Sequence, residues 1–125
     1  MNEMRLLFDQ PSYELSLNGR LTWRQKAGMV RKVRTTAKLL TLAEVRAYPE
    51  FEGFEPNVYD ITWFFSYGVE PDEDNIVGRC KSLLDGMADA LKVNDRGWHL
   101  GIIRRIRVRA KNPLRGRMEI TLRSE

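Results

Sequence analysis

The stretch from Asn57 to Leu91 constrains the fold most strongly, because its hydrophobic period changes partway along. Between Asn57 and Tyr67 the period is two, which predicts a strand. One face of this strand carries Tyr59, Ile61, Trp63, Phe65 and Tyr67. Gly68 and Pro71 end it, and from about Glu73 to Leu91 the apolar positions follow helical spacing. The apolar stripe of this predicted helix comprises Ile76, Val77, Cys80, Leu83, Leu84, Met87 and Leu91.

The segments before this stretch predict a strand and a helix. A short first strand spans Arg5 to Phe8, and a loop follows from Gln10 to Gly19. The turn residues of that loop are Pro11, Ser12, Asn18 and Gly19. Thr22 is a suitable N-cap for a helix that runs to about Arg46.

The segment after the stretch predicts two strands joined by a hairpin. The first runs roughly from Trp98 to Ala110, and the last from Arg117 to Arg123. Between them, Asn112, Pro113 and Gly116 mark the turn. The element order β-α-β-α-β-β predicts one α+β (mixed α/β) domain over residues 1–125, with a small mixed sheet and two main helices.

Composition excludes several classes of protein. The chain has 125 residues, of which 42% are hydrophobic, enough for one core. The single cysteine, Cys80, excludes an internal disulfide, and one Cys with one His leaves no ligands for structural zinc. Without a membrane-spanning run or a signal-peptide pattern, we expect a soluble, cytoplasmic protein with no membrane partner.

Charge is distributed unevenly along the chain. From Arg20 to Arg46 there are eight basic residues against one acid, and from Glu50 to Asp95 eleven acids against three bases. From Arg96 to Arg123 there are nine bases against one acid. One interpretation is an ordinary solvated surface. The other is that the basic flanks hold a polyanion while the acids hold cations against it.

Three consecutive acids, Asp72, Glu73 and Asp74, stand where the predicted strand gives way to the helix. An acid near a helix start caps backbone N–H groups and complements the helix dipole, which explains one of the three. In extended chain Asp72 and Asp74 share one side, where a divalent cation would relieve their repulsion.

A polar stripe on the predicted helix continues from these acids through Gly78, Lys81, Asp85 and Asp89. Gly78 places no side chain between Asp74 and Lys81, so the lysine could reach back toward the acids. Lys81 and Asp85 equally suit a surface ion pair. Asp95, in the loop before the next strand, is either a turn residue or a third carboxylate beside Asp72 and Asp74.

"PDEDN", the lysine-bearing helix with "LLDGMADAL", and "VNDRG" together resemble the RusA family of Holliday-junction resolvases, which is frequent in phages and prophages. The resemblance implies that Asp72, Asp74 and Asp95 are catalytic, metal-binding carboxylates and that Lys81 is the catalytic lysine. Asn75 and Asp85 would support them. The chain departs from the family at one point, because the prototype has its lysine four residues after the second Asp, where this chain has Gly78.

The implied activity is Mg²⁺-dependent endonuclease cleavage of four-way DNA junctions by paired nicks, with Mn²⁺ as a possible substitute and no nucleotide cofactor. A homodimer would match the two-fold symmetry of the junction. Phosphate contacts would come from Arg24, Arg31, Lys32, Arg34, Arg105, Arg107 and Arg109. Two alternatives stay open: a DNA-binding module without catalysis, and a nuclease of broader specificity for branched or flap DNA.

Overall fold

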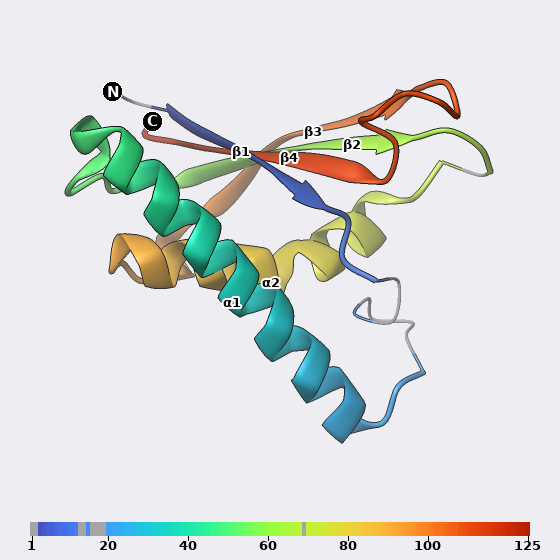
Figure 1. Cartoon of the computed structure of the whole chain (residues 1–125), viewed down its shortest axis with the longest axis horizontal. Coiled ribbons are helices and arrows are strands. Elements are labelled where there is room, and N and C mark those ends of the chain that lie inside the picture. Colours follow the sequence, from blue (N-terminus) through green and yellow to red (C-terminus); the bar gives the residue numbers. More distant parts are fainter. Residues whose placement is uncertain (1–2, 13–14, 16–19, 69) are drawn as a thin grey trace.

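The computed structural model describes residues 3–12, 15, 20–68 and 70–125. It contains a four-stranded sheet and two long helices, α1 and α2, that lie on the same face of the sheet (Figure 1). The strands are β1 (Glu3–Asp9), β2 (Val58–Phe65), β3 (His99–Arg107) and β4 (Arg117–Arg123). Their order across the sheet is β1-β4-β2-β3; β2 and β3 are parallel, and the other neighbouring pairs are antiparallel. The predicted α+β class and the order β-α-β-α-β-β are confirmed.

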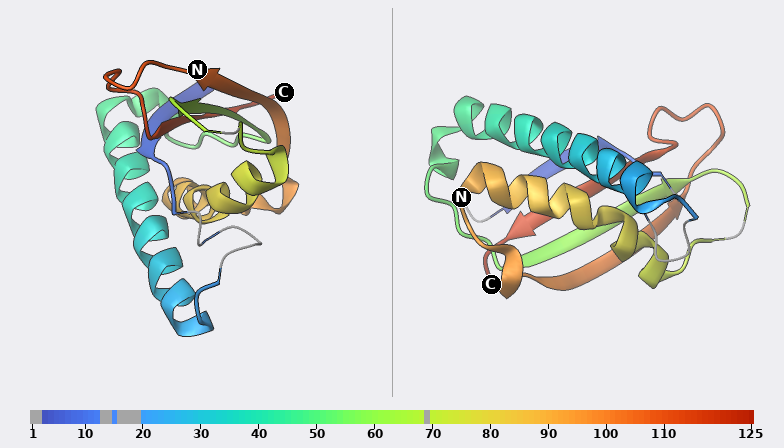
Figure 2. Two further views of the ribbon diagram at one scale, coloured as in Figure 1. Left: turned by 90° about the vertical axis from the view of Figure 1, so that its right-hand side faces the viewer. Right: turned by 90° about the horizontal axis from the view of Figure 1, so that it is seen from below.

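Helix α1 (Trp23–Ala47) begins where its capping residue predicts. The Thr22 hydroxyl accepts the Gln25 N–H at 3.3 Å, and the Gln25 side chain accepts the Thr22 N–H at 3.1 Å, so the two residues form a capping box. The N-terminal part of α1 extends beyond the sheet and α2, as the left view of Figure 2 shows. The predicted turn residues Asn18 and Gly19, in the loop before α1, lie outside the described residues.

Helix α2 (Glu73–Leu91) is the crossover between the parallel strands β2 and β3, and it has the predicted bounds. Of the three consecutive acids, Asp72 is its N-cap, because a carboxylate oxygen of Asp72 accepts the Asn75 N–H at 2.8 Å. At the other end, Lys92 adopts the left-handed conformation with φ of 58° and reverses the chain. The chain then makes a 3₁₀ turn, η3 (Asp95–Gly97), before β3.

The core lies between the sheet and the two helices. Met118, Ile120 and Leu122 alternate along β4 and are fully buried there. They pack with Ile61 and with the α2 stripe, of which Ile76, Cys80 and Met87 are fully buried. Within the described ranges, no helix is both long enough and apolar enough to cross a membrane.

Gly86 allows α1 and α2 to pack in close contact. A Cβ built on Gly86 would collide with the backbone carbonyl oxygen of Arg34 and would lie 2.8 Å from Cβ of Ala37. Beside this crossing, the Arg34 guanidinium donates to both carboxylate oxygens of Asp89, at 2.6 and 2.8 Å. A glycine contact and a bidentate ion pair therefore fix the two helices against each other.

Replacing Gly86 with Ala is expected to lower the free energy of unfolding by about 1–3 kcal/mol, the usual cost of overpacking. Helix propensity alone favours alanine by roughly 1 kcal/mol, but the added methyl group would press on the backbone of α1. Gly28→Ala in α1 is the control, because nothing lies within 4 Å of a Cβ built there. Urea denaturation measures both variants, and equal effects would contradict a close crossing at Gly86.

Candidate functional site

The structure brings Lys81, Asp85 and Asp95 together, and we call these three residues the Lys81 cluster. Lys81 and Asp85 lie one turn apart on α2, with Nζ of Lys81 3.5 Å from a carboxylate oxygen of Asp85. Asp95 reaches the same place because the chain reverses at Lys92 and forms η3 beside the helix. The 3₁₀ turn itself is stabilised by Asn94, whose side chain accepts the Arg96 N–H at 2.9 Å. The cluster therefore joins a helix face to the loop that follows that helix.

The two carboxyl groups of the cluster are close enough to affect each other. Burial raises the pKa of Asp85, and a hydrogen bond with the Asp95 carboxyl raises it further, whereas the Lys81 ammonium opposes the shift. Close approach of two carboxyl groups disfavours ionisation of both, so the Asp85 carboxyl group binds a proton more readily than an isolated aspartate does. Carboxylates paired beside a cation are typical of functional sites.

A hollow of about 220 Å³ opens beside the cluster. We call it the aromatic hollow, and its lining consists of Tyr59, Val77, Gly78, Lys81, Leu84, Asp95 and Trp98. Its apolar walls belong to β2, to α2 and to the residue before β3, while Lys81 and Asp95 supply charge. The backbone N–H of Trp98 donates to the backbone carbonyl of Asp95 at 3.0 Å, so one turn carries both the indole ring and the carboxyl group.

The structure does not bring Asp72 and Asp74 to Asp95. Asp74 precedes Asp85 by eleven residues in α2, which corresponds to roughly 16 Å along the helix axis. Within the residues that the structure describes, no group of three or more His, Cys, Asp or Glu side chains could hold a metal ion. The two acids and Asn75 belong instead to the first turn and its cap. The seven-residue interval from Asp74 to Lys81 accounts for this separation, because Lys81 and Asp85 lie further along the helix.

Several arginines predicted to contact DNA have partners within the protein. Arg34 forms the ion pair with Asp89 described above, which raises the pKa of Arg34 and lowers that of Asp89. On β3, Arg105 lies 2.9 Å from Glu70 and donates to the Pro71 carbonyl, and Arg107 donates to the carbonyls of Ser66 and Gly68. Arg105 and Arg107 therefore tie the loop before α2 to the edge of the sheet.

The remaining predicted contacts are exposed. Arg31 and Lys32 lie in the N-terminal half of α1, and Arg109 follows β3, which ends at Arg107 rather than at Ala110. Arg24 is also exposed, with its guanidinium carbon 5.3 Å from the ring centroid of Trp23. Within the described part of the chain, the predicted DNA contacts that face solvent without an ion-pair partner are thus mostly in α1.

The sequence pattern does not reveal that Tyr59 and Trp98 line the same hollow. Alternation places Tyr59 on an apolar strand face, and no periodic signal connects it with Trp98, which is 39 residues away. Cys80 supplies no nucleophile, because burial raises its pKa to about 12.

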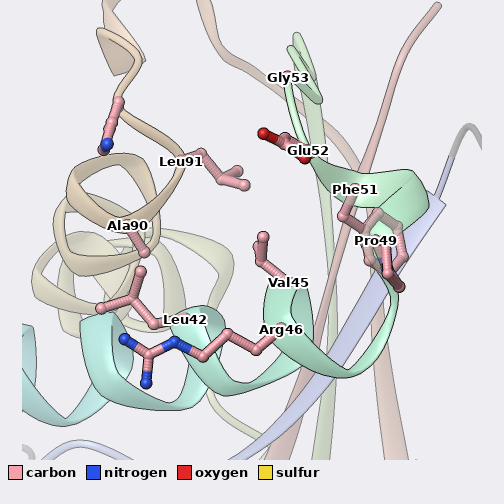
Figure 3. Close-up of a pocket in the computed structure, with 10 residues that line it drawn as sticks. Leu42, Val45, Arg46, Pro49, Phe51, Glu52, Gly53, Ala90 and Leu91 are labelled. Carbon is pink, nitrogen blue, oxygen red and sulfur yellow. The ribbon is translucent and has the colours of Figure 1, made fainter.

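A second hollow, of about 450 Å³, lies between the C-terminal ends of α1 and α2 and the turn at Pro49–Phe51 (Figure 3). Its walls are mainly apolar, with Val45, Phe51 and Leu91 among them, and it contains none of the predicted site residues.

No protein-family model matches the chain, and no curated protein matches it. The resemblance to the RusA resolvases therefore rests on the motifs of the sequence itself.

Asp85→Asn is expected to raise Tm at pH 7, and the increase should vanish near pH 3. A raised pKa means that the folded protein binds the Asp85 proton more tightly than the unfolded chain does. Wild-type stability therefore falls as pH rises through that pKa, and the amide removes this decrease. Asp89→Asn is the matched control with the opposite sign, because the pKa of Asp89 is lowered. Thermal unfolding between pH 3 and pH 7 measures both, and a lower stability of Asp85→Asn at pH 7 would contradict the carboxyl pairing.

Proposed function

We propose that this protein is a cytoplasmic, Mg²⁺-dependent endodeoxyribonuclease that cleaves four-way DNA junctions at the Lys81 cluster. The observation that carries the proposal is the pairing of Asp85 with Asp95 beside Lys81, next to an open hollow. The motif resemblance and the basic surface of α1 support the same conclusion.

Asp85 and Asp95 suit a magnesium ion, whereas the trio that the resemblance implies does not converge. Mg²⁺ in phosphoryl-transfer sites takes one or two carboxylates, several waters and substrate phosphate oxygens. Asp85 and Asp95 supply such a pair, while Asp72 caps a helix and Asp74 lies two turns before Lys81. When bound, the ion would activate a water molecule and neutralise charge that builds on the phosphate.

The residues of the cluster have distinct parts in hydrolysis. The water oxygen forms a bond to phosphorus, one P–O ester bond breaks, and a proton passes from the water to the leaving oxygen. Lys81, whose side chain is 74% exposed, can approach a phosphate and stabilise its developing charge. Asp95 lines the hollow, where its carboxyl group is placed to accept the proton of the water.

DNA would be held by the exposed cations of α1, chiefly Arg31 and Lys32. Contacts of this kind give affinity without sequence information. A four-way junction has approximate two-fold symmetry and requires two nicks, so a homodimer with one site per subunit is the assembly that we propose.

The best-supported rival is a DNA-binding module without catalysis. It is favoured by the capping role of Asp72 and by the separation of Asp72 and Asp74 from Asp95. A nuclease of broader specificity for branched or flap DNA would use the same residues, and a panel of labelled substrates separates it from a resolvase.

Asp95→Asn and Lys81→Met are each expected to lower cleavage of a labelled four-way junction by roughly 100-fold or more, the usual effect of removing one catalytic group. Junction binding should persist or tighten for Asp95→Asn, because repulsion of phosphates decreases. The readout is paired, symmetric nicking with and without Mg²⁺, with linear duplex as the control substrate. Full cleavage by both variants, or no cleavage by the wild type, would rule out the proposal.

Asp74→Asn, assayed in parallel, tests whether Asp74, in the first turn of α2, contributes to cleavage. An equal reduction in cleavage would support the metal-binding role that the resemblance implies for Asp74. Retained cleavage would show that the Asp85–Asp95 pair acts without it.

Combined replacement of Arg31 and Lys32 by Gln is expected to reduce the slope of log K against log salt by about 0.9 for each phosphate that the variant no longer neutralises. Arg34→Gln is the control, because Arg34 is already paired with Asp89. It should leave the salt slope unchanged and lower stability by roughly 1 kcal/mol or less, since both side chains are partly exposed. Fluorescence anisotropy at several salt concentrations measures the slopes, and a larger change for Arg34→Gln would contradict this assignment.

A further inference from the structure

We infer that the aromatic hollow binds one unpaired nucleobase of the DNA strand, stacked against Trp98, while the adjoining phosphate contacts Lys81. This inference deepens the proposed function, on which it rests, by naming what the site recognises in branched DNA. It begins from the chemistry of the lining, which combines two aromatic rings, aliphatic side chains, the Lys81 cation and the Asp95 carboxyl group.

The two rings are held in place without being fully covered. Tyr59 and Trp98 are half-buried and pack against the core, so their positions are fixed before any ligand arrives. Each still contributes surface to the hollow. A rigid aromatic surface beside open space is the arrangement on which nucleobases stack, because every base presents a π-face.

The polar atoms of the rings are available to a base edge. Among the residues that the structure describes, neither the Tyr59 hydroxyl nor the Trp98 indole N–H has a hydrogen-bond partner. Half-buried Tyr and Trp normally pair these groups. Burial raises the pKa of Tyr59, so its hydroxyl keeps its proton and remains a donor. Nucleobase edges carry matching acceptors.

The size and the charges of the hollow suit one nucleotide. Its volume of about 220 Å³ is roughly seven times the ~30 Å³ that a water molecule occupies in the liquid, enough for a single planar ring system. Lys81 is the cation of the lining and also belongs to the Lys81 cluster. A base in the hollow would therefore place its own phosphate beside the groups proposed to cleave it.

Duplex DNA cannot fill this hollow unless a base leaves the stack, which costs a few kcal/mol and costs least where bases are already unpaired. At a branch point the helical stack is interrupted, so a base there leaves it at a lower cost. Stacking on Trp98 would accordingly favour branched over linear DNA, without any sequence readout.

The experiment compares binding of two strands of equal charge in the absence of Mg²⁺. One is a thymidine oligonucleotide of about ten residues, and the other is a fully abasic strand of the same length. Wild-type protein is expected to bind the thymidine strand roughly 5- to 150-fold more tightly, the value of one stacked base. Trp98→Leu should abolish this preference and Trp98→Phe should keep most of it. Trp23→Leu, which removes an exposed ring of α1, should leave it unchanged.

Each outcome decides the inference. Equal binding of the two strands by the wild type, a preference that survives Trp98→Leu, or one that disappears in Trp23→Leu would overturn it. If Trp98→Leu fails to fold by circular dichroism, the wild-type comparison and Trp98→Phe still test it. Because no cleavage is measured, a base preference that depends on Trp98 would stand even if the protein did not nick junctions. A base preference that does not depend on Trp98 would overturn this inference alone and leave the proposed cleavage to its own test.

Discussion

The close crossing of α1 and α2 at Gly86 is the contact on which the rest of the molecule depends. It places the Arg34 backbone against α2, where any larger side chain would collide, and the Arg34–Asp89 ion pair then fixes the alignment of the helices. One face of α2 packs against α1 and another packs against the sheet. The remaining stripe, with Gly78, Lys81 and Asp85, borders the aromatic hollow and η3. One packing contact thus determines which side of α2 faces the hollow.

The reversal of the chain after α2 completes the site at an electrostatic cost. Lys92 adopts a left-handed conformation, which is unfavourable for a residue with a side chain. The following turn brings Asp95 against Asp85. Two carboxyl groups at close range oppose folding when both are charged. A cation, supplied by Lys81 or by a bound metal, would offset their repulsion. Strain and like charge concentrated beside a hollow are typical of functional sites.

The individual elements were predictable because their signals are local. Thr22 and Gln25 form a capping box at the expected helix start, the apolar stripe from Ile76 to Leu91 predicts the bounds of α2, and the alternation in β4 places Ile120 in the core. The predicted convergence of Asp72 and Asp74 with Asp95 depended on residues that are far apart in the chain. Asp72 shares a motif with Asp74, yet the length of α2 separates both from Asp95.

The arginines show the same limit. Arg34 has an acidic partner 55 residues away, and Arg105 has one in the loop before α2, neither of which a charge count along the chain reveals. Sequence alone determined the class of fold, the order of its elements and the supply of acids and bases. Tertiary structure decided which charges meet, because helix length, a left-handed cap and a glycine contact set distances that periodicity does not encode. It also placed Tyr59 and Trp98 together, since parallel pairing of β2 with β3 brings Tyr59 beside the start of β3, which directly follows Trp98.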